Sequence, residues 1–186
     1  MSFLYLVLIS ISAFFVARIG YKSVNSFQVS SIVSSILFIV LYFVSYPTFS
    51  LLSLHFIFTG LCLIFLIISY YEILNLEKKI IDLKNGNIQS LPLPIEKMYK
   101  LNFKILGFGL FLLSMALVSG FFMQSVFTSN IIVKISFTLI AWLIYLITFI
   151  GIKFFNLTVK RSVRNLFISL LAVLIAYIAN FYLVYN

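Results

Sequence analysis

Residues Leu51–Tyr71 read LLSLHFIFTGLCLIFLIISYY and are apolar almost throughout. A helix of about 20 such residues is long enough to cross the hydrocarbon core of a bilayer. The segment holds the only histidine of the chain, His55, and an ionisable residue within a span is a functional-site hypothesis. One helical stripe carries most of its polar or small side chains, and we expect it to face protein because lipid cannot satisfy such groups: His55, Thr59, Cys62, Leu66 and Ser69.

The composition places the whole chain in the membrane class. Hydrophobic residues make up 63% of the sequence and charged residues 9%, whereas soluble domains carry about 25% charged residues. The net charge of +9 does not indicate a nucleic-acid partner, because the basic residues lie between apolar segments rather than among exposed aromatic residues on one face. We therefore predict an integral membrane protein whose first partner is the lipid bilayer.

The pattern of apolar segments predicts an all-α fold, a polytopic transmembrane helical bundle that forms a single domain over residues 1–186. About six spans are expected, at about 3–19, 29–46, 51–71, 104–123, 131–152 and 165–185, with a cytoplasmic loop at about 72–103. From Glu72 onward apolar and charged residues alternate, which predicts an amphipathic continuation of the third helix. Asn85-Gly86-Asn87 is expected to end it by adopting left-handed backbone geometry.

The basic residues predict how the bundle is oriented. With six spans, all of the lysines and arginines except Lys134 fall on one side of the membrane. The positive-inside rule places that side in the cytoplasm and both termini outside. His55 then lies about one helical turn, on the order of 6 Å, below the outer surface. The same outer half of the bundle is expected to contain Met123, Lys134, Thr138 and Trp142.

These residues indicate a site for haem, although each also has an ordinary structural interpretation. Imidazole and thioether are the common neutral axial ligands of haem iron, and a cation can pair with a haem propionate. On the other hand, His55 can be hydrated or bonded to a carbonyl, Lys134 can reach the headgroups, and Trp142 can simply pack. The sequence contains no phosphate-binding glycine loop and no nucleophile elbow, so an enzyme is not predicted. No acidic residue lies in an expected span, which disfavours a proton-coupled transporter.

The C-terminal part of the chain is similar to a known family. The similar runs are LPLPIEKMYKLNFKILGFGLFLLSMALVSGFF (91–122), VKISFTLIAWLIYLITFIGIKFF (133–155), KRSVR (160–164) and AYIANF (176–181). They resemble the cytochrome c assembly membrane-protein family, and within it the YpjD-like inner-membrane proteins related to CcsA and CcmC. The resemblance extends over about residues 54–181. Its matching positions are Pro94, Met98, Phe103, Gly107, Phe108, Ser119-Gly120, Lys134, Ala141-Trp142 and Lys160-Arg161.

The resemblance implies a multi-pass protein of the bacterial inner (cytoplasmic) membrane that is not an enzyme and acts in cytochrome complex assembly. His55 resembles a histidine that is an axial ligand in the haem-handling relatives, whereas Val133 stands where those relatives carry a second histidine. Their tryptophan-rich outer segment is also missing. Haem would therefore bind through His55 alone, with Met123, across a homodimer, or not at all. The predicted cofactor-binding residues are His55, Lys134, Trp142 and Met123, with His55 as the metal ligand.

Two functions of different classes remain open at this point. The first is an accessory protein that binds or handles haem at the outer side, with cytochrome maturation proteins as partners. The second is a haem-free structural or regulatory membrane subunit that binds a partner protein through its serine, alanine and glycine faces. A small-solute carrier is a third and weaker interpretation.

Overall fold

The computed structural model describes residues 3–20, 26–85, 95–122, 129–155 and 158–184, without the side chains of 95–98, 129–131, 133–134 and 177–184. This part of the chain contains six helices and no strand, which confirms the all-α helical bundle. The helices are α1 (Phe3–Gly20), α2 (Ser26–Ser45), α3 (Leu51–Lys84), α4 (Ile95–Phe122), α5 (Ser129–Phe154) and α6 (Val159–Val184).

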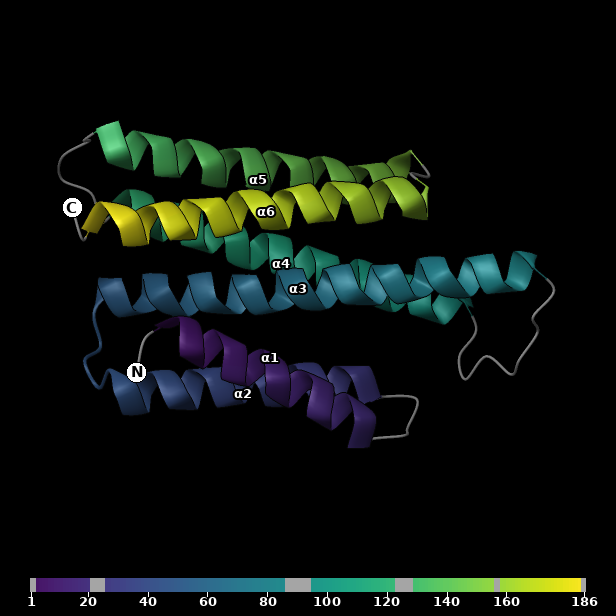
Figure 1. Cartoon of the computed structure of the whole chain (residues 1–186), viewed down its shortest axis with the longest axis horizontal. Helices are drawn as coiled ribbons and strands as arrows, with labels where there is room; N and C mark the ends of the chain where they lie inside the picture. Colours follow the sequence, from purple (N-terminus) through teal and green to yellow (C-terminus); the bar gives the residue numbers. More distant parts are fainter. Residues whose placement is uncertain (1–2, 21–25, 86–94, 123–128, 156–157, 185–186) are drawn as a thin grey trace.

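Consecutive helices pair as three antiparallel hairpins, and α3 lies at the centre of the bundle (Figure 1). The hairpins are α1–α2, α3–α4 and α5–α6, while α3 also contacts α1, α2 and α6. Because the number of described helices is even, the start of α1 and the end of α6 lie at the same end of the bundle (Figure 1). The side of the membrane that this end faces stays a prediction.

The described helices are suited to a bilayer. Five of them are long and apolar enough to cross a membrane: α1, α2, α3, α4 from Tyr99 and α5 from Ile135. Helix α6 has 26 residues and lies beside α5. Large apolar side chains such as those of Ile19, Val44 and Phe121 are exposed on the outside of the bundle, as a lipid-facing surface requires. These features are those of a membrane protein.

The central position of α3 explains its burial. The predicted stripe does face protein, since Cys62, Leu66 and Ser69 are buried. The other sides of the helix are buried too, and residues 60–66 are all buried. Four neighbouring helices surround α3, so its apolar residues pack against protein instead of lipid.

Helix α3 continues beyond the apolar segment to Lys84, as its amphipathic pattern predicts, and its last turns project past the start of α6 (Figure 1). Asn85 follows the helix, and its backbone N–H donates to the carbonyl of Ile81 at 3.1 Å. The φ of Asn85 is −84°, so the expected left-handed geometry is wrong for this residue. Gly86 and Asn87 lie outside the described residues.

Polar side chains bond to the backbone of the neighbouring helix where helices pack closely. The Ser34 hydroxyl of α2 donates to the carbonyl of Ser10 on α1 at 2.6 Å. The Ser169 hydroxyl of α6 donates to the carbonyl of Ala141 on α5 at 2.9 Å. Such bonds satisfy hydroxyl groups that lipid could not, and they join the two helices of a hairpin.

Two glycines make room for large rings at the helix crossings. A Cβ atom at Gly60 of α3 would overlap the ring of Phe38 on α2, and one at Gly109 of α4 would overlap the hydroxyl of Tyr145 on α5. Phe38 and Tyr145 are fully buried. Glycine is therefore the residue that these two crossings require.

Candidate functional site

The start of α3 positions His55. Ser50 is the N-cap of the helix, and its side-chain oxygen accepts a hydrogen bond from the backbone N–H of Ser53 at 3.2 Å. The Ser53 hydroxyl donates to the carbonyl of Thr48 at 2.6 Å. These bonds satisfy polar groups that a helix start leaves open. They place His55 in the second turn of α3, at the end of the bundle where α4 ends.

The imidazole of His55 is held by a serine of α4. Its Nδ1 lies 3.0 Å from the Oγ of Ser119, and the Ser119 hydroxyl donates its own hydrogen to the carbonyl of Ala116 at 3.1 Å. A serine hydroxyl can donate or accept, so the tautomer of the imidazole decides which of the two atoms donates. In either tautomer Nδ1 faces Ser119, and Nε2 is the other ring nitrogen. Metal-binding histidines are commonly oriented in this way, by a bond from their other ring nitrogen.

A glycine lets the His55 ring lie close to the backbone of α4. A Cβ atom at Gly120 would be 3.0 Å from Cε1 of His55 and 3.5 Å from its Nδ1. The first distance is shorter than ordinary carbon contacts, so a larger residue at position 120 would displace the ring. Ser119 fixes the orientation of the imidazole, and Gly120 allows its close distance to the backbone of α4.

A cavity of about 410 Å³ lies beside His55. Its walls come from the start of α3, the end of α4, the first turns of α5 and the later turns of α6. They consist mainly of leucine, isoleucine, valine, alanine and phenylalanine residues, with His55, Thr59, Cys62, Gly120 and Thr138 as the exceptions. The Thr59 hydroxyl donates to the backbone carbonyl of His55 at 2.8 Å. An apolar cavity of this size with few polar groups is typical of a small-molecule site.

The four predicted site residues differ in their position relative to the cavity and in whether the structure describes their side chains. His55 lines the cavity, and so does Thr138, which was expected in the same half of the bundle. Trp142 is not among the lining residues; its Nε1 donates to the Oγ of Ser114 on α4 at 2.8 Å. Met123 lies outside the described residues. Lys134 belongs to α5, but its side chain also lies outside them. The roles of Trp142, Met123 and Lys134 in binding a cofactor stay predictions.

Sequence reasoning missed the role of Ser119. The Ser119-Gly120 pair was noted only for its resemblance to a family pattern, and its contact with His55 depends on how α3 and α4 pack. Two signals were available: the serine next to a glycine near the end of a span, and the spacing of Ala116 and Gly120, which is typical of close helix contact. In the part of the chain that the structure describes, no three potential metal-ligating side chains of His, Cys, Asp or Glu lie together.

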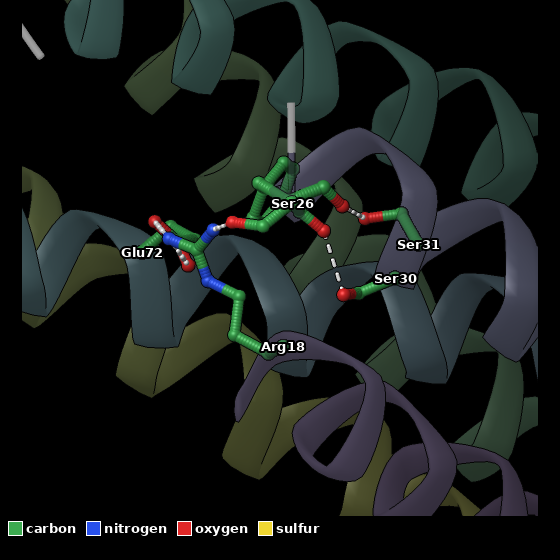
Figure 2. A network of polar contacts seen from close by, with 6 residues as sticks. Arg18, Ser26, Ser30, Ser31 and Glu72 are labelled. Atoms are coloured by element: carbon green, nitrogen blue, oxygen red, sulfur yellow. Dashed lines mark hydrogen bonds and ion pairs between the residues drawn. The ribbon is translucent and has the colours of Figure 1, made fainter. Parts of the chain in front are cut away.

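A second polar cluster lies where α1 ends and α2 begins, opposite to the start of α3 (Figure 1), and Figure 2 shows it from close by. The guanidinium of Arg18 lies 3.2 Å from Oε1 of Glu72, donates to Oε2 at 3.5 Å and also donates to the hydroxyl of Ser26. It lies over the ring of Phe27, 5.5 Å from the centroid. The Ser30 hydroxyl donates to the carbonyl of Ser26 at 2.6 Å. The cluster joins α1 and α2 to α3, so we interpret it as structural.

Comparison of the chain with protein-family models, with curated proteins and with solved structures gives no significant match. The resemblance to the cytochrome c assembly family thus stays a prediction.

Proposed function

We propose that this chain is a non-enzymatic membrane accessory protein that binds haem in the cavity beside His55 and acts in cytochrome maturation at the outer side of the bacterial inner membrane. One observation supports it above all: the only imidazole of the chain lines an apolar cavity and is oriented by Ser119. The resemblance described above supplies the identity of the cofactor.

In this proposal the cavity would supply one half of a haem site. His55 would bind the iron through Nε2, Ser119 would hold the ring plane, and the apolar walls would exclude water from the porphyrin. Met123 is the proposed second ligand and Lys134 the proposed partner of a propionate. A second copy of the chain is the alternative source of an axial ligand. When bound, haem would serve either as cargo for an apocytochrome or as an electron carrier.

An absorbance titration tests the proposal. Full-length protein purified in detergent is mixed with haem, and the Soret band is recorded for the wild type and for His55→Ala. We expect a shifted Soret band in the wild type and its loss in His55→Ala. Ser12→Ala is the control, because Ser12 is exposed and donates only to the carbonyl of Leu8 on its own helix, α1. A wild-type protein that takes up no haem contradicts the proposal.

A second candidate is a haem-free structural or regulatory subunit, and one observation favours it. A groove of about 520 Å³ runs between α2, α3 and α4, and small polar residues of α2, Ser31 and Ser35, line it. Such faces are common where transmembrane helices pair. A photo-crosslinking residue at Ile36, which lines the groove, would then capture a partner membrane protein, whereas one at the exposed Ile140 of α5 would not.

A further inference from the structure

A second hollow lies at the end of the bundle opposite to His55. It has a volume of about 550 Å³ and lies between the later turns of α3 and the first turns of α6. Helix α3 continues past the start of α6 at this end, and its later turns lie beside the first turns of α6 (Figure 1). Three cations, one carboxylate and two aromatic rings line the hollow: Lys160, Arg161, Arg164, Glu77, Tyr70 and Phe167.

The cations of this hollow are not neutralised by the described part of the chain. Lys160, Arg161 and Arg164 are all exposed. The ion pair that the described residues form is Arg18–Glu72, and none joins Glu77 to the three cations. Three positive charges against one negative charge leave the hollow attractive to an anion. Arginine is also the side chain whose planar group matches a phosphate with two parallel hydrogen bonds.

An apolar surface continues from the hollow along α6. The rings of Tyr70 and Phe167 lie 5.8 Å apart and mark the border between the charged turns and the apolar turns. Aromatic residues are common at this level of a membrane. Beyond it the helical stripe that begins with Arg164 continues through residues spaced by three or four, all of them exposed: Ile168, Leu171 and Ile175. A molecule with an anionic head and an apolar tail would match both parts of this surface.

We propose that the hollow binds the phosphate head group of an anionic glycerophospholipid, whose acyl chains lie along the exposed stripe of α6. Basic pockets between transmembrane helices on the cytoplasmic side are typical sites for such head groups. Glu77 would accept hydrogen bonds from head-group hydroxyls, which makes phosphatidylglycerol the natural probe. Free phosphate shares the anionic chemistry, but it would leave the apolar stripe of α6 unused. This proposal is independent of haem binding.

Native mass spectrometry of the full-length protein in detergent tests the proposal. Phosphatidylglycerol, phosphatidylethanolamine and phosphatidylcholine are titrated in parallel. We expect the wild type to prefer phosphatidylglycerol, and Lys160→Gln or Arg164→Gln to weaken its binding about five-fold, the effect of losing one cation near an anionic lipid. Lys78→Gln is the matched control: it removes the same charge from an exposed lysine of α3 that does not line the hollow.

Three results would overturn the proposal. Equal binding of phosphatidylglycerol and phosphatidylethanolamine would show that the hollow does not select an anionic head group. An equal loss in Lys78→Gln and Lys160→Gln would assign the binding to general surface charge. Displacement of phosphatidylglycerol by the same concentration of inorganic phosphate would identify a site for a free anion instead of a lipid.

Discussion

The guanidinium of Arg18 lies 3.2 Å from the carboxylate of Glu72, and this ion pair joins the first helix to the central one (Figure 2). The Glu72 side chain is only 4% exposed, whereas that of Arg18 is 27% exposed. A buried carboxylate needs a partner, because charge is costly to remove from water. Loss of Arg18 would leave the buried Glu72 carboxylate unpaired, so this ion pair is important for the position of α1 against α3.

Replacing Arg18 should destabilise the bundle, and replacing Glu72 as well should restore most of the loss. We expect Arg18→Gln to lower the free energy of unfolding by about 2 kcal/mol, less than for a fully buried pair because Arg18 is partly exposed. The double variant with Glu72→Gln removes the unpaired charge. Unfolding in detergent with rising denaturant measures both, and Asp82→Asn on the same helix is the control. A double variant as unstable as Arg18→Gln would contradict the interpretation.

Gly60→Ala should destabilise the contact between α2 and α3. The added Cβ would overlap the ring of Phe38, which is fully buried. Overpacking of this kind costs about 1–3 kcal/mol. The smaller side chain of Phe38→Leu should recover part of this loss in the double variant, so the two effects should not add. Additive losses, measured by thermal unfolding in detergent, would show that the two residues do not meet.

Periodicity was enough to predict the helices but not their neighbours. The apolar lengths predict membrane-spanning helices, and the alternation after Glu72 predicts the long extension of α3 to Lys84. Periodicity does not indicate which helix lies at the centre of the bundle. An apolar residue such as Ile64 is equally suited to lipid and to protein. It is buried because the four neighbouring helices pack around α3.

The candidate site could be predicted only in part, because its contacts also depend on which helices are neighbours. His55 stands out because it is the single histidine, and Thr138 follows from the expected depth of α5. The partnership of His55 with Ser119 links residues of two different helices, 64 positions apart in the chain. Nothing in the local sequence of either helix specifies their register. Trp142 could not be assigned from its depth alone, since its bond to Ser114 also depends on packing.

Ser119→Ala should weaken haem binding without removing it. The variant keeps the His55 imidazole but loses the hydroxyl that bonds to Nδ1. The loss of such a supporting bond typically costs 10–100-fold in metal affinity, and we expect about ten-fold for a single neutral bond. Ser119→Thr keeps a hydroxyl and should retain most of the affinity. Haem titration measures the series; equal affinity in Ser119→Ala and the wild type would mean that Ser119 does not orient the ligand.

Gly120→Ala should also weaken haem binding, for a steric reason. The new Cβ would lie 3.0 Å from Cε1 of His55 and would displace the ring. Gly20→Ala provides a matched control, because a Cβ at Gly20 has no atom within 4 Å. We expect a several-fold loss of haem affinity for the first variant and no change for the second. If the two variants bind haem equally well, the close approach of His55 to α4 is not required.

The orientation of the bundle can be tested with introduced cysteines. The native Cys62 is buried, so a charged maleimide that does not cross membranes should report on an exposed new cysteine. Phe49→Cys lies just before α3, at the end of the bundle that contains His55, and Lys84→Cys lies at the opposite end. The positive-inside rule predicts labelling of Phe49→Cys in intact cells and of Lys84→Cys only after the membrane is opened. The reverse pattern would place His55 near the cytoplasm and the three cations of α6 outside. It would contradict a haem site at the outer surface, because that site depends on which end of the bundle faces the cytoplasm.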